Sequence, residues 1–412
     1  IRMFKVPMSR SMTPVDTVNA RWTVPSPELA PDYSAVAWYF AKRMSQVLDV
    51  PVGIVCATYG GSKVESWLPR EILETYDDIS LDPADLDKIP HYLRPLVMYN
   101  AMFYPIKDYV YKGIIWYQGC SNMGDGALYN EKMKALVASW RKEFNKPDMP
   151  FYFVQLAPFN YGNPYRLPIL WEAQQKFADE DKNAAMAVTN DIGNFRDIHP
   201  RNKQDVGARL ALLALKYTYG KKDLVADSPF FDSLKIENGK AVVTFRNAKE
   251  LKTKDGKPAK YFEIAGADNK FHPATVTLNG NKATLSSDKP YLVRYAWNHN
   301  ITTNLVNENN LPAGAFRASI PVPVRDALNR LVPEAKNMKV AYALSAKKIW
   351  ESGSPLYKQN NSKALAGKKI KTIGYFMHLI SNDGKESYVF ATVDPFTQDV
   401  AKLGLPTAAD NN

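Results

Sequence analysis

Residues 112–122 have the sequence KGIIWYQGCSN, an apolar run that leads into a glycine turn. The run from Lys112 to Tyr117 is typical of a strand in a parallel sheet, because helices cover both faces of such a sheet. Helical spacing of apolar side chains follows it, at Tyr129, Met133, Leu136, Val137 and Trp140. This order of strand, turn and helix predicts an α/β fold.

The same cycle recurs on both sides of this stretch, between about residues 31 and 219. Buried strands are predicted at 52–58, 151–156 and 185–189. Helices are predicted after the caps Asp32 and Ser34, at about 168–181, and at 202–219, where Gly220 closes the last one. We therefore expect residues 1–222 to form an α/β domain in which helices cover both faces of a parallel sheet.

The pattern changes near Asp223, where helical periodicity ends and alternating strands begin. Asn238-Gly239 and Asn279-Gly280 separate pairs of these strands, as expected of tight hairpin turns. The pattern predicts a β-sandwich-like domain over residues 223–323. A short helix near 324–331 and strands on either side of Asp383-Gly384 then predict a C-terminal β-rich module over residues 324–412.

The composition excludes several classes of protein. The 412 residues suffice for two or three domains, and no apolar run is long enough to insert into a membrane. The net charge of +11 would suit a nucleic acid, an anionic surface or an acidic sugar, but it is spread over scattered lysines, which favours a solvated basic surface over any charge-selected partner. Cys56 and Cys120 cannot build a disulfide framework and lack metal-ligand spacing. The oligomeric state stays open.

Residues 1–6 predict a half-buried strand and lack the features of a signal peptide. Two interpretations follow: the protein is cytosolic, or its true start lies outside this sequence.

Two candidate functional segments are glycine turns that each follow a predicted strand, where α/β folds bind ligands. Gly60-Gly61 follows the strand at 52–58, and its backbone amides are suited to facing an anion. Asn122 lies in the turn after Tyr117, where its amide is suited to donating to an oxyanion. A simple turn at Gly61 and a loop-stabilising Asn122 are the alternative interpretations.

The third segment contains Asp197 and His199, between the strand at 185–189 and the helix at 202–219. His199 is the histidine that combines an acidic neighbour with a position at the sheet edge. A carboxylate beside a histidine can fix the tautomer of a general base in acyl transfer. The alternative is that both residues only organise the helix entrance beside Pro200.

In their sequences and in their order along the chain, these motifs resemble those of sialate O-acetylesterases. The resemblance is carried by W-Y-Q-G-x-S-N at 116–122, D-I-H-P-x-N-K at 197–203, and the segment around Gly60-Gly61-Ser62. It covers most of residues 1–220 and continues more weakly to about Arg317. It implies an SGNH-hydrolase-like, flavodoxin-like fold and a carbohydrate esterase.

The resemblance also implies roles for individual residues. His199 becomes the general base and Asp197 its orienting acid, while Gly61 and Asn122 become oxyanion donors. Gln118 and Cys120 are then expected at the substrate. The implied reaction is the hydrolysis of acetyl esters of sugars, 9-O-acetylated sialic acids first, through an acyl-enzyme and without a cofactor. A periplasmic or secreted location is also implied.

The sequence departs from the family pattern in two respects. The family's nucleophilic serine lies in a G-Q-S-N-M segment, which is expected upstream of Ile1. The family usually has Glu where this chain has Cys120. Ser121 is a less suitable nucleophile, because it belongs to the oxyanion segment, and we expect its hydroxyl to hydrogen-bond locally.

Two other functions stay open at this point: an acetylesterase for plant or other polysaccharides, and a non-catalytic carbohydrate-binding protein.

Overall fold

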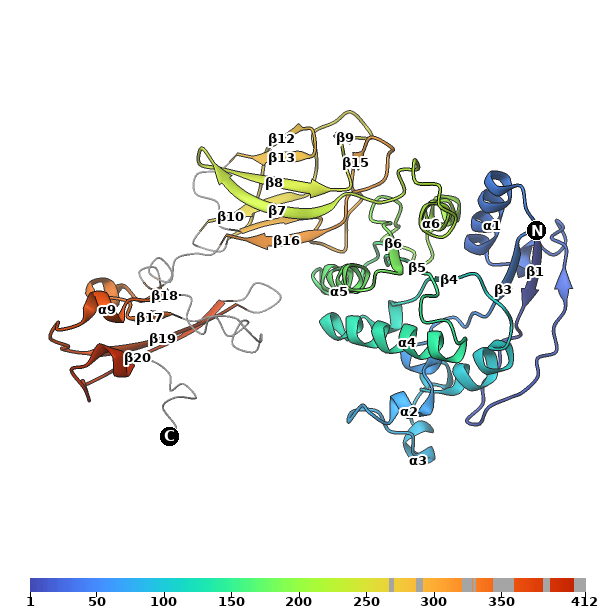
Figure 1. The fold of residues 1–412 in the computed structure, drawn as a ribbon, viewed down its shortest axis with the longest axis horizontal. Coiled ribbons are helices and arrows are strands. Elements are labelled where there is room, and N and C mark those ends of the chain that lie inside the picture. Colours follow the sequence, from blue (N-terminus) through green and yellow to red (C-terminus); the bar gives the residue numbers. More distant parts are fainter. Residues whose placement is uncertain are drawn as a thin grey trace.

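The computed structural model describes residues 1–266, 270–286, 292–320, 328, 331–343, 359–380 and 386–403 (Figure 1). The helix expected near 324–331 and the turn at Asp383-Gly384 lie largely or wholly outside these residues.

The N-terminal half contains parallel strands, as predicted. β4 (Ile114–Trp116), β5 (Phe151–Val154) and β6 (Ala184–Ala187) pair in parallel in that order. β4 and β5 lie within predicted apolar runs, and β6 begins one residue before the predicted run at 185–189.

A second group of strands lies beside the first. β1 (Arg2–Lys5) pairs in parallel with β3 (Gly53–Cys56) and antiparallel with β2 (Trp22–Thr23). β3 and β4 are not hydrogen-bonded neighbours, so the strands form two three-stranded sheets and not one. An apolar run predicts a strand, but packing between distant segments decides its partner.

Helices cover both faces of the β4-β5-β6 sheet. Along β5, Phe151 and Phe153 pack into one hydrophobic core with α4 (Tyr129–Glu143) and α5 (Arg166–Glu180). The alternate residues of β5 pack into a second core with α1 (Ala35–Leu48) and α6 (Lys203–Tyr217), which lie side by side (Figure 1). This alternation is the pleat of a strand buried on both faces.

Side chains cap the first turns of the two helices of this second core. The Ser34 hydroxyl accepts a hydrogen bond from the Ala37 amide at the start of α1, at 3.3 Å. Asn202 Oδ1 accepts from the Asp205 amide at the start of α6, at 3.1 Å. The predicted role of Ser34 is confirmed, whereas Asp32 lies in a preceding 3₁₀ turn.

The shorter helical elements are η1 (Ala30–Asp32), η2 (Val64–Trp67), α2 (Arg70–Leu73), α3 (Pro83–Leu86), η3 (His91–Leu93), η4 (Tyr99–Phe103), η5 (Tyr104–Ile106), η6 (Cys120–Asn122), η7 (Gly126–Leu128), η8 (Pro333–Asn337), α9 (Ser362–Leu365) and η9 (Val400–Leu403).

Two antiparallel sheets follow and pack face to face. The first has the order β12-β13-β8-β7 and the second β11-β10-β14-β16, with a separate β9-β15 pair. Their bounds are β7 (Phe230–Glu237), β8 (Lys240–Arg246), β9 (Leu251–Thr253), β10 (Phe262–Ala265), β11 (His272–Pro273), β12 (Val276–Asn279), β13 (Lys282–Leu285), β14 (Leu292–Tyr295), β15 (Leu305–Asn307) and β16 (Phe316–Ser319). Phe245 of one sheet meets Phe316 of the other, with ring centroids 5.7 Å apart.

Asn238-Gly239 forms the predicted turn between β7 and β8, with both φ angles positive. In the other hairpin Asn279 still pairs with Lys282, so the turn residues are Gly280 and Asn281, one position later than predicted.

The C-terminal module is β-rich, as expected. β17 (Tyr342–Ala343) pairs with β18 (Gln359–Asn360), and β19 (Ile373–Ile380) pairs with β20 (Glu386–Val393). It has a small core of its own, to which Val332 and Ala335 contribute. The proposed domain boundaries themselves stay predictions.

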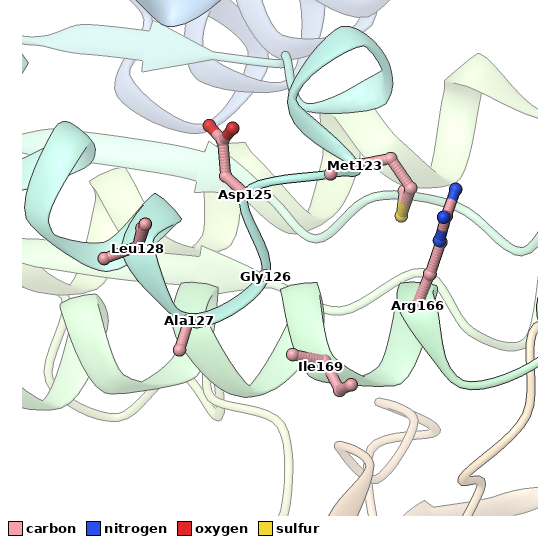
Figure 2. A pocket seen from close by; sticks show the side chains of 8 residues that line it. Met123, Asp125, Gly126, Ala127, Leu128, Arg166 and Ile169 are labelled. Carbon is pink, nitrogen blue, oxygen red and sulfur yellow. The ribbon is translucent and has the colours of Figure 1, made fainter. Parts of the chain in front are cut away.

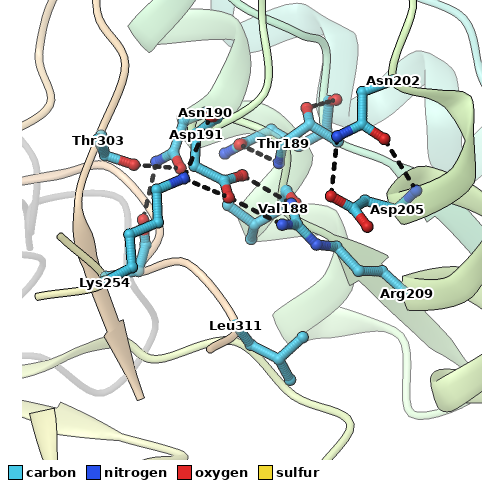
Figure 3. Close-up of polar contacts among 12 residues, drawn as sticks. Val188, Thr189, Asn190, Asp191, Asn202, Asp205, Arg209, Lys254, Thr303 and Leu311 are labelled. Carbon is cyan, nitrogen blue, oxygen red and sulfur yellow. Dashed lines mark hydrogen bonds and ion pairs between the residues drawn. The ribbon is translucent and has the colours of Figure 1, made fainter. Parts of the chain in front are cut away.

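A buried ion-pair cluster joins the α/β unit to the sandwich (Figure 3). Arg209 of α6 binds both oxygens of Asp191, at 2.7 and 2.8 Å. Lys254, which follows β9, reaches the same carboxylate at 3.2 Å. Asn190 also donates to the carbonyl of Ala313, at 2.8 Å. The segment after β6 is therefore anchored from both sides before it reaches Asp197.

Candidate functional site

Two of the predicted turns meet in the structure. The Ser121 hydroxyl donates to the Gly61 carbonyl at 2.6 Å, and Gln118 Nε2 donates to the Ser62 carbonyl at 3.0 Å. The turn after β3 therefore lies against the turn after β4. The hydrogen bond of Ser121 was expected to be local, but its partner lies 60 positions away in the sequence.

Asn122 lies at the centre of this junction and is fully buried. Its Nδ2 donates to Glu65 at 2.8 Å and to Asp125 at 2.7 Å. Its Oδ1 accepts from the Val64 amide at 3.0 Å and from Gln118 at 2.7 Å. Both amide hydrogens are thus engaged by carboxylates. The role of Asn122 as an oxyanion donor stays a prediction. It requires Nδ2 to give up its hydrogen bond to Glu65 or to Asp125 in favour of the substrate.

Lys132 of α4 closes a ring of polar contacts beneath Asn122. Its Nζ lies 2.6 Å from Glu65 Oε1 and 2.8 Å from Asp125 Oδ2, the two carboxylates that also hold Asn122. The three charged side chains are at most 15% exposed. Burial alone would raise the pKa of Glu65, but the hydrogen bond and charge of Lys132 hold it below its ordinary value. The same carboxylates raise the pKa of Lys132 against the effect of burial.

Sequence reasoning missed this ring, although one signal was present. Lys132 follows Tyr129 by three positions and precedes Leu136 by four, so it shares their buried helix face. A lysine on such a face needs a buried anion. We refer to Glu65, Asn122, Asp125 and Lys132 below as the Asn122 ring.

Gln118 is also engaged within the protein. Its Nε2 donates to Ser62 and Asn122, and its Oε1 accepts from the Tyr129 hydroxyl at 2.9 Å. No amide hydrogen is left for a substrate, so contact with substrate through Gln118 stays a prediction.

Cys120 is half-buried and begins η6. Burial raises the pKa of its thiol, and the neighbouring Lys203 ammonium partly opposes this. Lys203 Nζ in turn lies 5.4 Å from the centroid of the Tyr117 ring. The first residue of α6 thus lies against the turn after β4.

Asp197 and His199 are adjacent but are not arranged as a catalytic pair in this structure. His199 Nδ1 lies 3.9 Å from Asp197 Oδ1, beyond hydrogen-bond distance, and the imidazole side chain is 86% exposed. The carboxylate instead accepts from the backbone amide of His199, at 2.9 Å. Among the described residues, no hydrogen bond or ion pair connects His199 to Gly61 or Asn122. The entrance of α6 is capped by Asn202, so these two residues are not needed for that purpose.

A hollow of about 390 Å³ lies beside the loop that follows Asn122 in the sequence (Figure 2). The loop Met123–Leu128 lines one side and Arg166 and Ile169 of α5 line the other. Its acidic side chain, Asp125, is already paired with Lys132. The hollow contains none of the predicted catalytic residues, so we do not assign the chemistry to it.

The described residues contain no group of side chains arranged to hold a metal ion. Over the same ranges, every helix is too short or too polar to cross a membrane.

Parallel strands flanked by helices, with polar turns meeting at one edge, define an open α/β scaffold of the kind that binds ligands at the carboxyl ends of its strands. A family model described as "Carbohydrate esterase, sialic acid-specific acetylesterase" matches residues 33–216. Human sialate O-acetylesterase is 29% identical over 317 residues, covering 68% of this chain and 60% of the human protein. The Rattus norvegicus sialate O-acetylesterase is 27% identical over 364 residues, covering 72% and 66% respectively.

The crystal structure of a carbohydrate acetylesterase from Xanthomonas citri is also similar. It shares 36% sequence identity with a TM-score of 0.70, over 78% of this chain and 73% of that one. The chain belongs to the carbohydrate acetylesterases. It spans about 60% of the length of its human relative.

Proposed function

We propose that this protein is a carbohydrate O-acetylesterase that hydrolyses 9-O-acetylated sialic acids by a Ser-His-Asp-type mechanism. Family membership supports the acetyl ester of a sugar as the scissile group. The sialic acid is supported by the description of the matching family model and by the names of the mammalian relatives.

One observation carries the proposal: the three predicted segments gather at one edge of the α/β unit. The turns at Gly61 and Asn122 are joined by direct hydrogen bonds, and Lys203 places the start of α6 against Tyr117. The segment before α6 also contacts the loop between β5 and α5, because the Asn160 amide donates to the Phe195 carbonyl at 3.4 Å. The carboxyl ends of strands are where open α/β sheets bind ligands.

In the proposed reaction, His199 accepts the proton of a serine hydroxyl as the serine oxygen attacks the acetyl carbonyl. The negative charge that develops on the carbonyl oxygen is stabilised by the Gly61 amide and the Asn122 side chain. The protonated His199 then gives its proton to the departing sugar oxygen. Water attacks the acyl-enzyme in the same way, releasing acetate and restoring the serine.

The nucleophile in this proposal is the family's serine, outside residues 1–412. Ser62 and Ser121 are poor substitutes because their hydroxyls are engaged elsewhere. Ser62 donates to the Tyr59 carbonyl at 2.8 Å and accepts from Trp67 Nε1 at 2.9 Å, while Ser121 donates to Gly61.

His199 is suited to its proposed role because its imidazole is exposed and close to Asp197. Within the described ranges, the exposed imidazole has no hydrogen-bond partner that it must give up, and Asp197 is 3.9 Å away. Catalytic hydrogen bonds often tighten only when substrate binds.

The test is acetate release by protein expressed from the complete reading frame, with 9-O-acetylated sialic acid and with acetylated xylan as substrates. The wild type should hydrolyse the sialic acid ester, and His199→Ala should lower kcat by about a thousandfold or more. His272→Ala is the control, because His272 is exposed on β11 of the sandwich.

Each result has a distinct meaning. Activity on xylan alone would replace the sialate assignment with a polysaccharide acetylesterase. An inactive wild type would favour the non-catalytic, carbohydrate-binding alternative. An active His199→Ala variant would remove His199 from the mechanism. The periplasmic or secreted location also stays a proposal, and fractionation of cells that express the protein would test it.

A further inference from the structure

Lys203 is a half-buried cation without a carboxylate partner. Within the described ranges, no carboxylate oxygen lies within ion-pair distance of its Nζ. The two buried cations of the α/β unit, by contrast, are paired: Lys132 with Glu65 and Asp125, and Arg209 with Asp191. A cation withdrawn from water without an anion carries an uncompensated desolvation cost. Consistent with this, burial lowers the pKa of Lys203, and Asp197 and Cys120 oppose the shift from a distance.

The position of Lys203 connects it with the candidate site. The residue begins α6, four positions after His199. Its ammonium lies over the ring of Tyr117, at the end of β4, and within electrostatic range of the Cys120 thiol. A cation held against an aromatic face keeps its N–H donors available for a further acceptor. Lys203 therefore offers a positive charge between the His199 segment and the turn at Cys120.

We propose that the Lys203 ammonium binds the carboxylate of an acidic sugar and selects anionic over neutral substrates. This inference rests on the proposed function, because it deepens the choice of substrate at the same site. A sialic acid carries both an acetylatable hydroxyl and a carboxylate, whereas neutral acetylated sugars lack the second group. The carboxylate of the bound sugar supplies the anion that the described part of the chain does not provide to Lys203.

The test is a binding measurement that does not depend on hydrolysis. The complete protein is titrated calorimetrically with free sialic acid and with its uncharged methyl ester, and the ratio of the two affinities is recorded. We expect the wild type to prefer the acid, and Lys203→Met to lower the ratio at least tenfold, as expected for the loss of one charge-assisted hydrogen bond. Lys182→Met is the matched control, because the Lys182 side chain is 85% exposed and lies before β6.

A second variant tests the role of the Lys203 charge without removing the lysine. Cys120→Glu places a carboxylate beside Lys203 and should lower the ratio as Lys203→Met does, while the lysine is still present. The ratio is insensitive to partial unfolding, because unfolding lowers both affinities alike. An unchanged ratio in both variants would overturn the proposal, as would a wild type that binds the acid no better than the ester.

The two proposals can fail separately. Preferred binding of the acid without hydrolysis of any acetyl ester would reject the esterase and retain the anion site. Hydrolysis with no preference for the acid would do the reverse.

Discussion

At the scale of single residues, Gly61 shows how tightly the turn after β3 is built. Its φ of +76° lies in the left-handed region, and an added Cβ would be 3.0 Å from the Tyr92 ring. Gly60 has no atom within 4 Å of such a Cβ and no left-handed φ. The two adjacent glycines are therefore a matched pair.

We expect Gly61→Ala to lower the free energy of unfolding by about 1–2 kcal/mol, because a side chain is strained in this conformation. Gly60→Ala should change it by less than about 0.5 kcal/mol. Urea denaturation of both variants is the measurement. Equal effects would show that the backbone at Gly61 is not under this constraint.

Lys132 supplies the single positive charge of the Asn122 ring, so removing it leaves two buried carboxylates facing each other. We expect Lys132→Met to lower the free energy of unfolding by about 3 kcal/mol at pH 7. Lys134→Met, on the same helix, should cost less than about 1 kcal/mol, because that lysine pairs with exposed partners on the surface.

The effect of Lys132→Met should also depend on pH. In the wild type the pKa of Glu65 lies below its ordinary value near 4.5, so its contribution is complete above that pH and is lost as the pH falls through the lower folded pKa. Without Lys132, burial raises the pKa of Glu65, and protonation then stabilises the folded variant. The difference between the wild type and the variant should therefore shrink between pH 7 and about pH 4. A constant difference in denaturation curves over this range would contradict the role of Glu65.

At the scale of elements, the contact between α1 and α6 depends on one glycine inside a helix. A Cβ at Gly207 would lie 2.7 Å from the Val36 carbonyl oxygen and 2.8 Å from the Phe40 amide nitrogen. Both are backbone atoms, so neither can rotate away. The close approach of α1 and α6 thus requires the missing side chain.

Helix propensity and packing make opposite predictions for Gly207→Ala. Propensity alone would stabilise α6 by about 1 kcal/mol. The added methyl group would press against the backbone of α1, and such overpacking should cost about 1–3 kcal/mol. Because the backbone of α1 cannot rotate away, we expect Gly207→Ala to lower the free energy of unfolding. Thermal denaturation shows whether the variant is more or less stable than the wild type. A higher Tm in the variant would mean that α1 can move away from the added methyl group.

At the scale of the whole molecule, Asp191 connects the segment before the candidate base with the sandwich. Its carboxylate is 4% exposed and depends mainly on Arg209, whereas Lys254 is a more exposed second partner. The two cations thus differ in how much of the buried charge they compensate.

Replacing each cation should separate these contributions. Arg209→Met should lower the free energy of unfolding by about 3 kcal/mol or more, because it leaves a buried carboxylate poorly paired. Lys254→Met should cost about 1 kcal/mol or less. Chemical denaturation of the two variants tests this order, and a larger effect of Lys254→Met would show that the contact with the sandwich is the dominant one.

The sequence by itself determined the elements and the family. Apolar spacing located β4, β5, α4 and α6, because burial on one or both faces leaves a local period in the chain. Asn238-Gly239 marked a hairpin, because these residues accept positive φ at low cost. The motifs at 116–122 and 197–203 indicated the esterase resemblance.

Only the tertiary structure decided which groups meet. It paired β3 with β1 and not with β4, and it brought Lys132 to Glu65 across 67 positions of sequence. It also showed that the amide of Asn122 is already engaged, that the carboxylate of Asp197 is bound to backbone, and that Lys203 has no ion-pair partner among the residues that the structure describes. These properties depend on side chains that are distant in sequence, and local patterns carry no record of such contacts.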